Sequence, residues 1–208
     1  MRPYRLAIFD FDGTLADSFP WFLGVLEDLA RAHGFKAPSA EERETLRGLP
    51  AREIVRRFEI PAWRLPAVAA DMRARKVQAA QSIRLFDGVP QALSNLKDRG
   101  VVLAIVSSDS EASIRTTMGP TADLISHWSC GADLFGKAAK FSRLRRKTGV
   151  AAADTICVGD EDRDALAAGQ ARLAFGAVAW GFATRQALAA RKPALVFDEV
   201  GDLVRIAG

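Results

Sequence analysis

The stretch Ile8-Phe9-Asp10-Phe11-Asp12-Gly13-Thr14-Leu15 decides the fold of this chain. Residues 4–11 are mostly apolar and are followed by Gly13, a residue typical of turns. This pattern predicts a buried parallel strand that ends at two aspartates. In open α/β sheets, the loops after such strands carry ligands. The alternative is a strand that ends in an ordinary Asp-Gly turn, so the pattern needs support from the rest of the chain.

Two carboxylates one residue apart repel each other, so a fold that keeps Asp10 and Asp12 needs a bound cation, a shared proton or both. Mg²⁺ meets the first need because it is a hard ion that takes few protein carboxylates together with phosphate oxygens of a substrate. One aspartate then stays free to act as a nucleophile or as an acid. The stretch therefore predicts a magnesium site at the end of a strand.

The chain after this strand divides into a helical stretch and an alternating stretch. Apolar residues at helical spacing predict helices over 16–33, 41–46, 51–58 and 63–80, with no strand among them. From residue 85 onward, the pattern predicts strands over 101–106, 125–130, 155–158, 175–180 and 195–197, and helices over 91–99, 111–118, 138–148, 162–170 and 185–190. Strands that alternate with helices indicate an α/β fold with a parallel sheet and helices on both faces. The helical stretch is then an insertion, placed where a lid would sit.

The composition is that of an ordinary globular protein, with 49% hydrophobic and 26% charged residues among 208. The formal charge of +4 allows an anionic partner, but the basic residues are dispersed, so a small acidic substrate fits as well as nucleic acid. Cys130 and Cys157 predict no disulfide framework, and Cys157 lies in an apolar run. Because the chain shows neither a signal peptide nor an apolar run of membrane-spanning length, we expect a cytoplasmic protein without a membrane partner.

Polar residues follow two more predicted strands. Ser107 ends the second strong strand, where its hydroxyl and the amides of Ser108 and Asp109 are suited to hold a phosphoryl group. The alternative for Ser107 is a helix N-cap, although Ser110 or Asp109 is also placed to cap the helix. The fourth strand ends in the acidic run 159–164. The start of a helix favours acidic residues and so accounts for one or two of them, but it does not account for the Gly-Asp pair at the end of a strand.

Four motifs in this order resemble the haloacid dehalogenase superfamily, in its phosphoglycolate-phosphatase-like branch. Asp10-Phe11-Asp12-Gly13-Thr14 is similar to its first motif, and Ser107 to its second. Lys137 resembles the lysine of the third motif, with Lys140 as the competing residue one turn later. Asp160 and Asp164 resemble the fourth motif, in which the first aspartate ligates magnesium and the later one supports it, while Glu161 stays a possible ligand.

The resemblance implies a Rossmann-like catalytic core over residues 1–15 and 85–208 and a helical cap over residues 16–84. It also implies a magnesium-dependent phosphatase in which Asp10 attacks phosphorus and Asp12 serves as acid and base. Mg²⁺ would be held by Asp10, the backbone carbonyl of Asp12, and Asp160, with charge on the phosphoryl group stabilised by Ser107 and Lys137. A true dehalogenase is disfavoured because its reaction needs no second aspartate.

The expected partner is a small phosphorylated metabolite and not nucleic acid, and nothing in the sequence predicts an oligomeric state. Candidate substrate contacts are Thr14, Ser108 and Arg47, and the aromatic and basic residues Trp21, Phe22, Trp63 and Arg64 of the insertion are candidates to face the site. For the tryptophans, packing inside the insertion is the alternative. Two other functions stay open: a phosphotransferase or sugar-phosphate mutase of β-phosphoglucomutase type, and a non-catalytic protein that binds a phosphorylated ligand.

Overall fold

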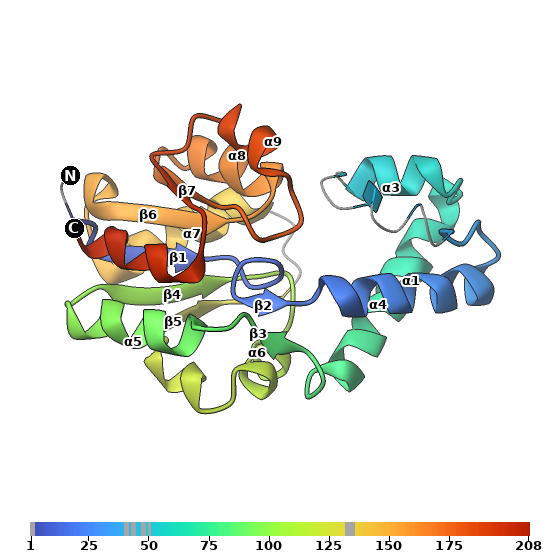
Figure 1. Cartoon of the computed structure of the whole chain (residues 1–208), viewed down its shortest axis with the longest axis horizontal. Coiled ribbons are helices and arrows are strands. Elements are labelled where there is room, and N and C mark those ends of the chain that lie inside the picture. The colour runs from blue at the N-terminus through green and yellow to red at the C-terminus, as the bar shows by residue number, and fades with distance from the viewer. Residues whose placement is uncertain (1–2, 40–41, 43–44, 47–48, 50, 132–135) are drawn as a thin grey trace.

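The computed structural model describes residues 3–39, 42, 45–46, 49, 51–131 and 136–208 (Figure 1). Six parallel strands form its central sheet in the order β5-β4-β1-β6-β7-β8. Their bounds are β1 Leu6–Phe9, β4 Val102–Val106, β5 His127–Ser129, β6 Thr155–Gly159, β7 Ala174–Val178 and β8 Leu195–Phe197. The continuous apolar runs form the central strands because β1, β4 and β6 need side chains that can be buried on both faces.

Helices cover both faces of this sheet, as the alternating pattern predicts. One face packs against α5 (Val89–Asp98), α6 (Glu111–Met118) and η4 (Val200–Ala207) through residues such as Phe9 and Leu93. The other face packs against α7 (Gly136–Thr148), α8 (Asp162–Gln170) and α9 (Arg185–Ala189) through residues such as Ile8 and Cys157. The predicted fold class is confirmed, and Cys157 has the expected role of a small buried hydrophobe. Short 3₁₀ turns, which the sequence did not predict, span η2 (Gly119–Leu124) and η3 (Ala152–Asp154).

The insertion lies beyond the carboxyl ends of the strands (Figure 1). Its described helices are α1 (Phe19–His33), α3 (Ala51–Arg57), η1 (Ala62–Arg64) and α4 (Leu65–Ala79). They share a hydrophobic cluster of their own, in which Leu29 and Phe58 are fully buried. Helix α1 ends where predicted, because Gly34 adopts the left-handed conformation that closes a helix. We call residues 16–84 the helical segment.

Two very short strands join the helical segment to the sheet, and the sequence did not predict them. Strand β2 (Ala16–Asp17) pairs antiparallel with β3 (Arg84–Leu85), so both connections run side by side. A two-residue strand has no pattern of its own and forms only because a partner from a distant part of the chain is present. The ribbon holds the entry and the exit of the helical segment together.

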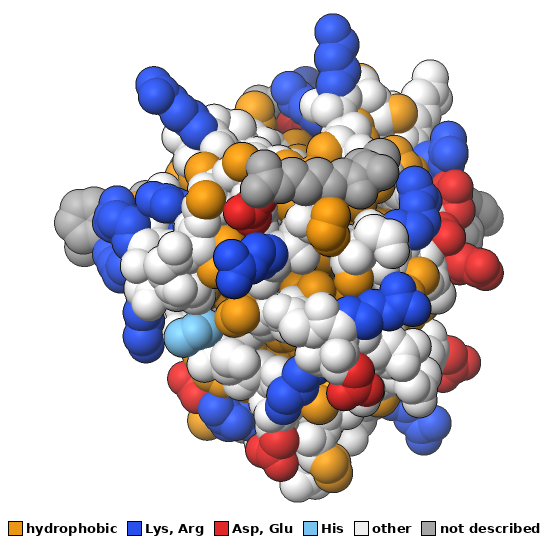
Figure 2. Space-filling view, turned by 90° about the vertical axis from the view of Figure 1, so that its left-hand side faces the viewer, with side chains coloured by type: hydrophobic (Ala, Val, Ile, Leu, Met, Phe, Trp, Pro, Cys, Tyr) orange, Lys and Arg blue, Asp and Glu red, His pale blue; other side chains and the backbone are white. Residues whose placement is uncertain are grey.

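The surface at the opposite end of the sheet carries no single block of positive charge. Figure 2 looks at the end of the molecule where both termini lie, and there Lys and Arg side chains are interspersed with Asp and Glu. This dispersion agrees with the sequence pattern. Among the described residues, no helix is both long enough and apolar enough to cross a membrane.

Candidate active site

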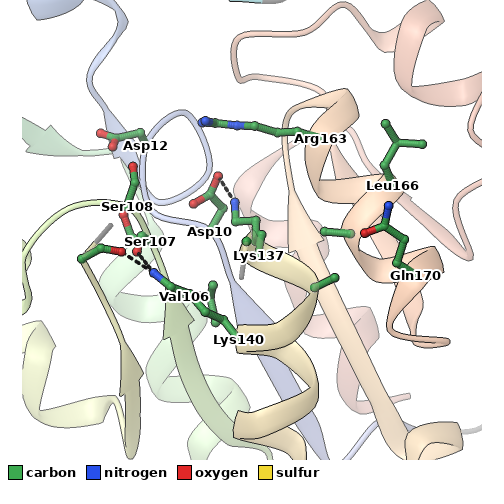
Figure 3. Close-up of a pocket in the computed structure, with 14 residues that line it drawn as sticks. Asp10, Asp12, Val106, Ser107, Ser108, Lys137, Lys140, Arg163, Leu166 and Gln170 are labelled. Atoms are coloured by element: carbon green, nitrogen blue, oxygen red, sulfur yellow. Dashed lines mark hydrogen bonds and ion pairs between the residues drawn. The ribbon is translucent and has the colours of Figure 1, made fainter. Parts of the chain in front are cut away.

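Three adjacent strands bring the predicted motifs to one edge of the sheet. Strands β1, β4 and β6 end at Phe9, Val106 and Gly159, and the next residues are Asp10, Ser107 and Asp160. Figure 3 shows the side chains of Asp10, Ser107 and Lys137 converging there. Parallel strands that start in register place their carboxyl ends together, so residues far apart in sequence become neighbours.

Asp10 is a buried carboxylate with a basic partner. Its Oδ1 accepts a hydrogen bond of 2.8 Å from the Phe11 amide, and its Oδ2 lies 2.6 Å from Lys137 Nζ. Burial alone would raise the pKa of Asp10, but the ammonium of Lys137 and the guanidinium of Arg163 hold it below its ordinary value. Asp10 is therefore an ionised carboxylate, which is the form a nucleophile needs.

Asp160 is fixed by hydrogen bonds to both of its carboxylate oxygens. The Thr14 hydroxyl donates to Oδ1 at 2.7 Å, and the Phe182 amide donates to Oδ2 at 2.8 Å. Gly13 is required in this arrangement because its φ is +71° and a Cβ there would overlap the Asp160 carboxylate. Thr14, a predicted substrate contact, is thus placed to orient an acid of the site, and it lines neither of the two cavities described below.

Asp164 reaches the site from the first turn of α8. Its Oδ2 accepts a hydrogen bond of 3.0 Å from the Glu161 amide within a capping box, and its Oδ1 lies 2.5 Å from Lys137 Nζ. Glu161 instead ion-pairs with Arg163, so its side chain has a partner outside the acid cluster. Gly159 allows this close approach, since a Cβ there would overlap the Asp164 carboxylate.

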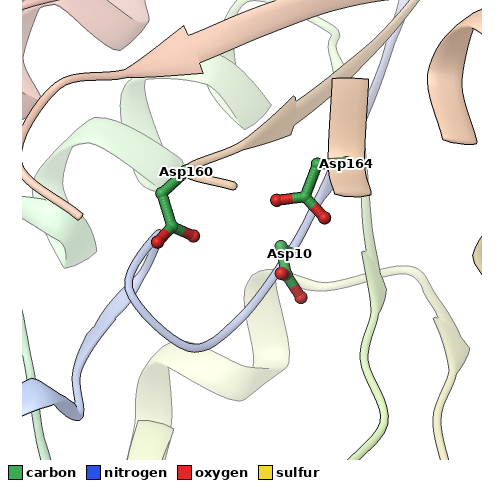
Figure 4. A group of neighbouring side chains, drawn as sticks. All are labelled: Asp10, Asp160 and Asp164. Atoms are coloured by element: carbon green, nitrogen blue, oxygen red, sulfur yellow. The ribbon is translucent and has the colours of Figure 1, made fainter. Parts of the chain in front are cut away.

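Asp10, Asp160 and Asp164 form a cluster that suits a divalent cation (Figure 4). One carboxylate oxygen from each lies within 4.8 Å of the others, and all three side chains are buried. Burial and the neighbouring carboxylates of Asp164 and Asp10 raise the pKa of Asp160 well above its ordinary value, and burial likewise raises the pKa of Asp164. Buried carboxylates that repel one another in this way are compensated by a hard cation, so the donor set fits a metal ion.

The two candidate lysines occupy different places. Lys137 Nζ lies between Asp10 and Asp164, whose charges raise its pKa against the effect of burial. Lys140 is also buried, but its Nζ donates to the backbone carbonyls of Ser107, at 2.9 Å, and Gly131. The geometry therefore favours Lys137 as the cation beside Asp10, while Lys140 links the loops after β4 and β5.

The loop after β4 presents the predicted serines. Ser110 caps helix α6 by accepting a hydrogen bond of 3.2 Å from the Ser113 amide, so capping does not occupy Ser107. The buried Ser107 hydroxyl accepts from the Asp109 amide at 3.1 Å, which leaves its proton for another acceptor. Ser107 and Ser108 both line the cavity above Asp10.

Two cavities share Asp12 in their linings. The first chamber, of about 410 Å³, is bounded by the core, and its lining includes Asp10, Ser107 and Lys137 (Figure 3). The second chamber, of about 300 Å³, lies between the core and the helical segment. Its lining joins the apolar side chains of Phe19, Trp21, Phe22, Met72 and Phe182 to the polar side chains of Asp12, Arg73, Lys76, Asp109 and Arg163.

The predicted contacts from the helical segment divide into two groups. Trp21 and Phe22 line the second chamber, as expected of residues that face the site. Trp63 instead lies 74% exposed at the surface, with the Arg64 guanidinium 4.6 Å from its ring centroid, and neither residue lines the described chambers. Arg47 lies outside the described residues.

The sequence did not predict that the charged side chains of Lys76, Asp109 and Arg163 belong to the site. Lys76 of α4 ion-pairs with Asp12 and, at 2.5 Å, with Asp109, while Arg163 lines both chambers. Burial and the Asp12 carboxylate raise the pKa of Asp109 to about 6. Asp109 and Arg163 could have been identified from the sequence because they lie beside predicted motifs. Lys76 could not, because the sequence does not distinguish it from other lysines on the surface of a helix.

Known proteins share the sequence pattern of this chain. The family model of the haloacid dehalogenase-like hydrolases matches residues 7–178. A phosphoglycolate phosphatase of Synechococcus elongatus is 32% identical over 200 residues, which cover 95% of this chain and 94% of the relative. Phosphoglycolate phosphatase 1 of Pseudomonas aeruginosa is 26% identical over 217 residues, which cover 96% of this chain and 78% of that relative.

Solved structures share the same architecture. A haloacid dehalogenase-like family hydrolase of Streptococcus pneumoniae superposes with a TM-score of 0.84 at 17% identity, and 97% of each chain is covered. CbbY of Rhodobacter sphaeroides, solved in complex with phosphate, superposes with a TM-score of 0.74 at 22% identity, and 96% of each chain is covered. The sheet and the helical segment both fall within these matched lengths.

Proposed function

Because the chain belongs to the haloacid dehalogenase-like hydrolase family, we propose that it is a magnesium-dependent phosphatase that hydrolyses a small phosphate monoester through an aspartyl-phosphate on Asp10. The match to hydrolases over most of the chain identifies an enzyme, a phosphohydrolase, rather than a non-catalytic binding protein. The observation that carries the proposal is the position of Asp10, which is buried beside Lys137 and the carboxylates of Asp160 and Asp164.

The proposal assigns the two parts of the chain different roles. Residues 1–15 and 85–208 form the catalytic core, and residues 16–84 form a cap over it. The separate hydrophobic cluster of the helices supports this division, as does the ribbon through which both connections pass. Residues of the core then carry the chemistry, and residues of the cap enclose the leaving group.

In the first step, a carboxylate oxygen of Asp10 attacks phosphorus, and the bond from phosphorus to the leaving oxygen breaks. Asp12, two residues along the same loop, gives its proton to the leaving oxygen. In the second step, the ionised Asp12 takes a proton from a water molecule that attacks phosphorus and releases Asp10. Asp12 ends protonated again, and inorganic phosphate is the second product.

One ammonium and several hydrogen-bond donors lie near the position proposed for the transferred group. The ammonium of Lys137 faces Asp10, and the Ser107 hydroxyl and the loop at Ser108 line the chamber that would receive the phosphoryl oxygens. Asp10, Asp160 and the backbone carbonyl of Asp12 would hold Mg²⁺, supported by Asp164. When bound, this ion supplies charge that stabilises the phosphoryl oxygens as they become more negative.

The relatives indicate which substrate to test first. Several of the matched proteins are phosphoglycolate phosphatases, including the one that shares 32% identity. Phosphoglycolate is a small monoester with a carboxylate on its leaving group, and the second chamber is small and includes Arg73 and Lys76 in its lining. We therefore propose a small phosphorylated carboxylic acid as the substrate class.

Phosphate release tests the proposal directly. The full chain would be given a panel of small monoesters, phosphoglycolate among them, with Mg²⁺ and with a chelator, and compared with the Asp10→Asn variant. We expect release that requires Mg²⁺ and is abolished by Asp10→Asn. The matched control is Asp98→Asn, which removes an exposed carboxylate far from the motifs and is expected to leave release unchanged. Full activity in Asp10→Asn would overturn the mechanism, and release without Mg²⁺ would overturn the metal requirement.

A further inference from the structure

We propose that Arg163 determines substrate specificity: its guanidinium binds the carboxylate of the leaving group and favours esters in which that carboxylate is attached to the carbon that carries the ester oxygen. Glu161 is the positioning residue that orients this guanidinium. The inference rests on the proposed function and deepens it, because it names the residue that recognises the substrate class and the place of the acid group on the substrate.

Arg163 stands at the boundary between the two chambers. Among the described residues, Asp12, Ser108 and Arg163 belong to the linings of both chambers. In the proposed reaction the phosphoryl group occupies the first chamber and the leaving group occupies the second, so the bond that breaks lies at this boundary. A cationic side chain there can reach the part of the leaving group that is nearest to phosphorus.

The guanidinium of Arg163 is available to an anion. Figure 3 shows this side chain extended from the first turn of α8 toward the loop that carries Asp10 and Asp12. Its ion pair within the described part of the chain is with Glu161, which lies closest to Nε. A guanidinium has five N–H donors in a planar fork, so one carboxylate cannot occupy them all. The side chain is also 61% exposed, so a substrate can reach it.

The charge of Arg163 also reaches the carboxylate that attacks phosphorus. Burial raises the pKa of Asp10, and the charges of Lys137 and Arg163 hold it below its ordinary value. An anion bound by Arg163 therefore lies near the reacting phosphorus. In phosphoglycolate the carboxylate is attached to the carbon that carries the ester oxygen, so this group is held near phosphorus by the substrate itself.

The other two cations of the second chamber are placed differently. Lys76 already contacts the carboxylates of Asp12 and Asp109, which compensate its charge. Arg73 lines the second chamber but not the first, so it is suited to groups farther from phosphorus. The carboxylate of a short acid therefore meets Arg163, whose planar fork can donate to both carboxylate oxygens.

Glu161 limits the arrangements of the Arg163 side chain. The Glu161 backbone is fixed at the start of α8, where its amide donates to Asp164 Oδ2 at 3.0 Å within the capping box. Its side chain is 21% exposed and belongs to the lining of the second chamber. An arginine that a fixed partner already orients loses less conformational entropy when it binds an anion.

Two esters of similar size test the inference. Ethyl phosphate carries a methyl group where phosphoglycolate carries its carboxylate. Arg163→Met removes the guanidinium, so both esters lose its effect on Asp10 but only phosphoglycolate loses a charged hydrogen-bond donor. We expect kcat/KM to fall on the order of 100-fold for phosphoglycolate and by less than about 10-fold for ethyl phosphate. The variant should also lose the preference for phosphoglycolate over an ester whose acid is one methylene longer.

Three further variants make the test specific. Arg163→Lys keeps a positive charge without the planar fork, so it is expected to restore part of the loss for phosphoglycolate. Glu161→Gln is expected to give a smaller loss with the same dependence on the carboxylate. Arg146→Met removes an exposed guanidinium from α7 that lines neither chamber, and this matched control is expected to change the hydrolysis of neither ester.

The outcomes separate this inference from the proposed function. Equal losses for both esters in Arg163→Met, or a wild type that does not prefer phosphoglycolate, would overturn the specificity role and leave the phosphatase intact. Phosphate release that survives Asp10→Asn would instead overturn the proposed function. If melting shows that Arg163→Met does not fold, the same comparison of esters in Arg163→Lys and Glu161→Gln decides, and equal losses there would reject the inference.

Discussion

The edge of the sheet and the helical segment hold their functional side chains in different ways. At the sheet edge, Asp160 receives hydrogen bonds from a hydroxyl and from a backbone amide, and Asp164 belongs to a capping box. In the helical segment, Lys76 reaches the site on a flexible stem, and its ammonium ion-pairs with carboxylates of the core. Under the proposed function, the chemistry would depend on groups that several hydrogen bonds hold in place, whereas enclosure would depend on contacts that form when two parts of the chain meet.

The largest expected effect is at the rigid edge, in Asp160→Asn. Removing this charge relieves repulsion from Asp164 and Asp10, so the metal-free protein should melt at a higher temperature than the wild type. Activity should fall by at least about 100-fold because the metal loses a ligand. The stabilisation by Mg²⁺, about 2.7 kcal/mol in the wild type at 100 times the dissociation constant, should be lost as well.

Melting curves and phosphate release, each with and without Mg²⁺, measure these effects. The matched control is Asp162→Asn, two residues away, where the carboxylate is 44% exposed and pairs with Arg191. That variant should retain both activity and the Mg²⁺ response. An Asp160→Asn protein that is still stabilised by Mg²⁺ would show that the cluster of buried acids is not the metal site.

The second expected effect is a loss of stability when a fully buried leucine is truncated, and each region contains one such leucine for comparison. Leu93→Ala in α5 and Leu29→Ala in α1 should each cost about 2 to 5 kcal/mol of local stability, since each leaves a cavity. Hydrogen exchange should show the loss across the sheet for Leu93→Ala but confined to the helices for Leu29→Ala. Equal loss of protection everywhere in both variants would contradict the division into core and cap.

The sheet could be predicted from the sequence because its strands are continuous apolar runs. Helices 111–118 and 162–170 and strand 195–197 have the predicted bounds, and Asp10, Ser107, Lys137, Asp160 and Asp164 all reach one edge. Each of these residues lies at the end of a predicted strand or in the first turn of a helix close to its predicted start. The topology of a parallel sheet then brings these residues together.

The helical segment could not be predicted to the same depth. Helix α4 buries only Val68 among its residues, so the spacing that predicts a helix there does not indicate which of its side chains face the core. Lys76 and Asp12 are 64 residues apart, and their contact depends on how the segment packs. The ribbon of β2 and β3 was missed for the same reason, because each strand is defined by its distant partner.

A smaller effect is expected from Trp21→Ala. This side chain lines the second chamber beside Lys76, so its removal enlarges the space for the leaving group and weakens one boundary of the ammonium's environment. We expect KM for the preferred monoester to rise by about 3- to 10-fold, equivalent to roughly 1 kcal/mol, with kcat less affected. An unchanged KM would remove Trp21 from the substrate contacts and leave it a packing residue.

The smallest effect is expected from Trp63→Ala, a substitution of the same residue type within the same segment. Trp63 is 74% exposed, and its described contact is the Arg64 guanidinium at 4.6 Å, which solvent screens. Stability should therefore change by no more than about 0.5 kcal/mol, and both kcat and KM should match the wild type. Steady-state kinetics and melting of the two tryptophan variants, measured together, test whether lining the second chamber distinguishes a substrate contact from a surface residue. A rise in KM for Trp63→Ala equal to that for Trp21→Ala would mean that the substrate meets a different face of the helical segment.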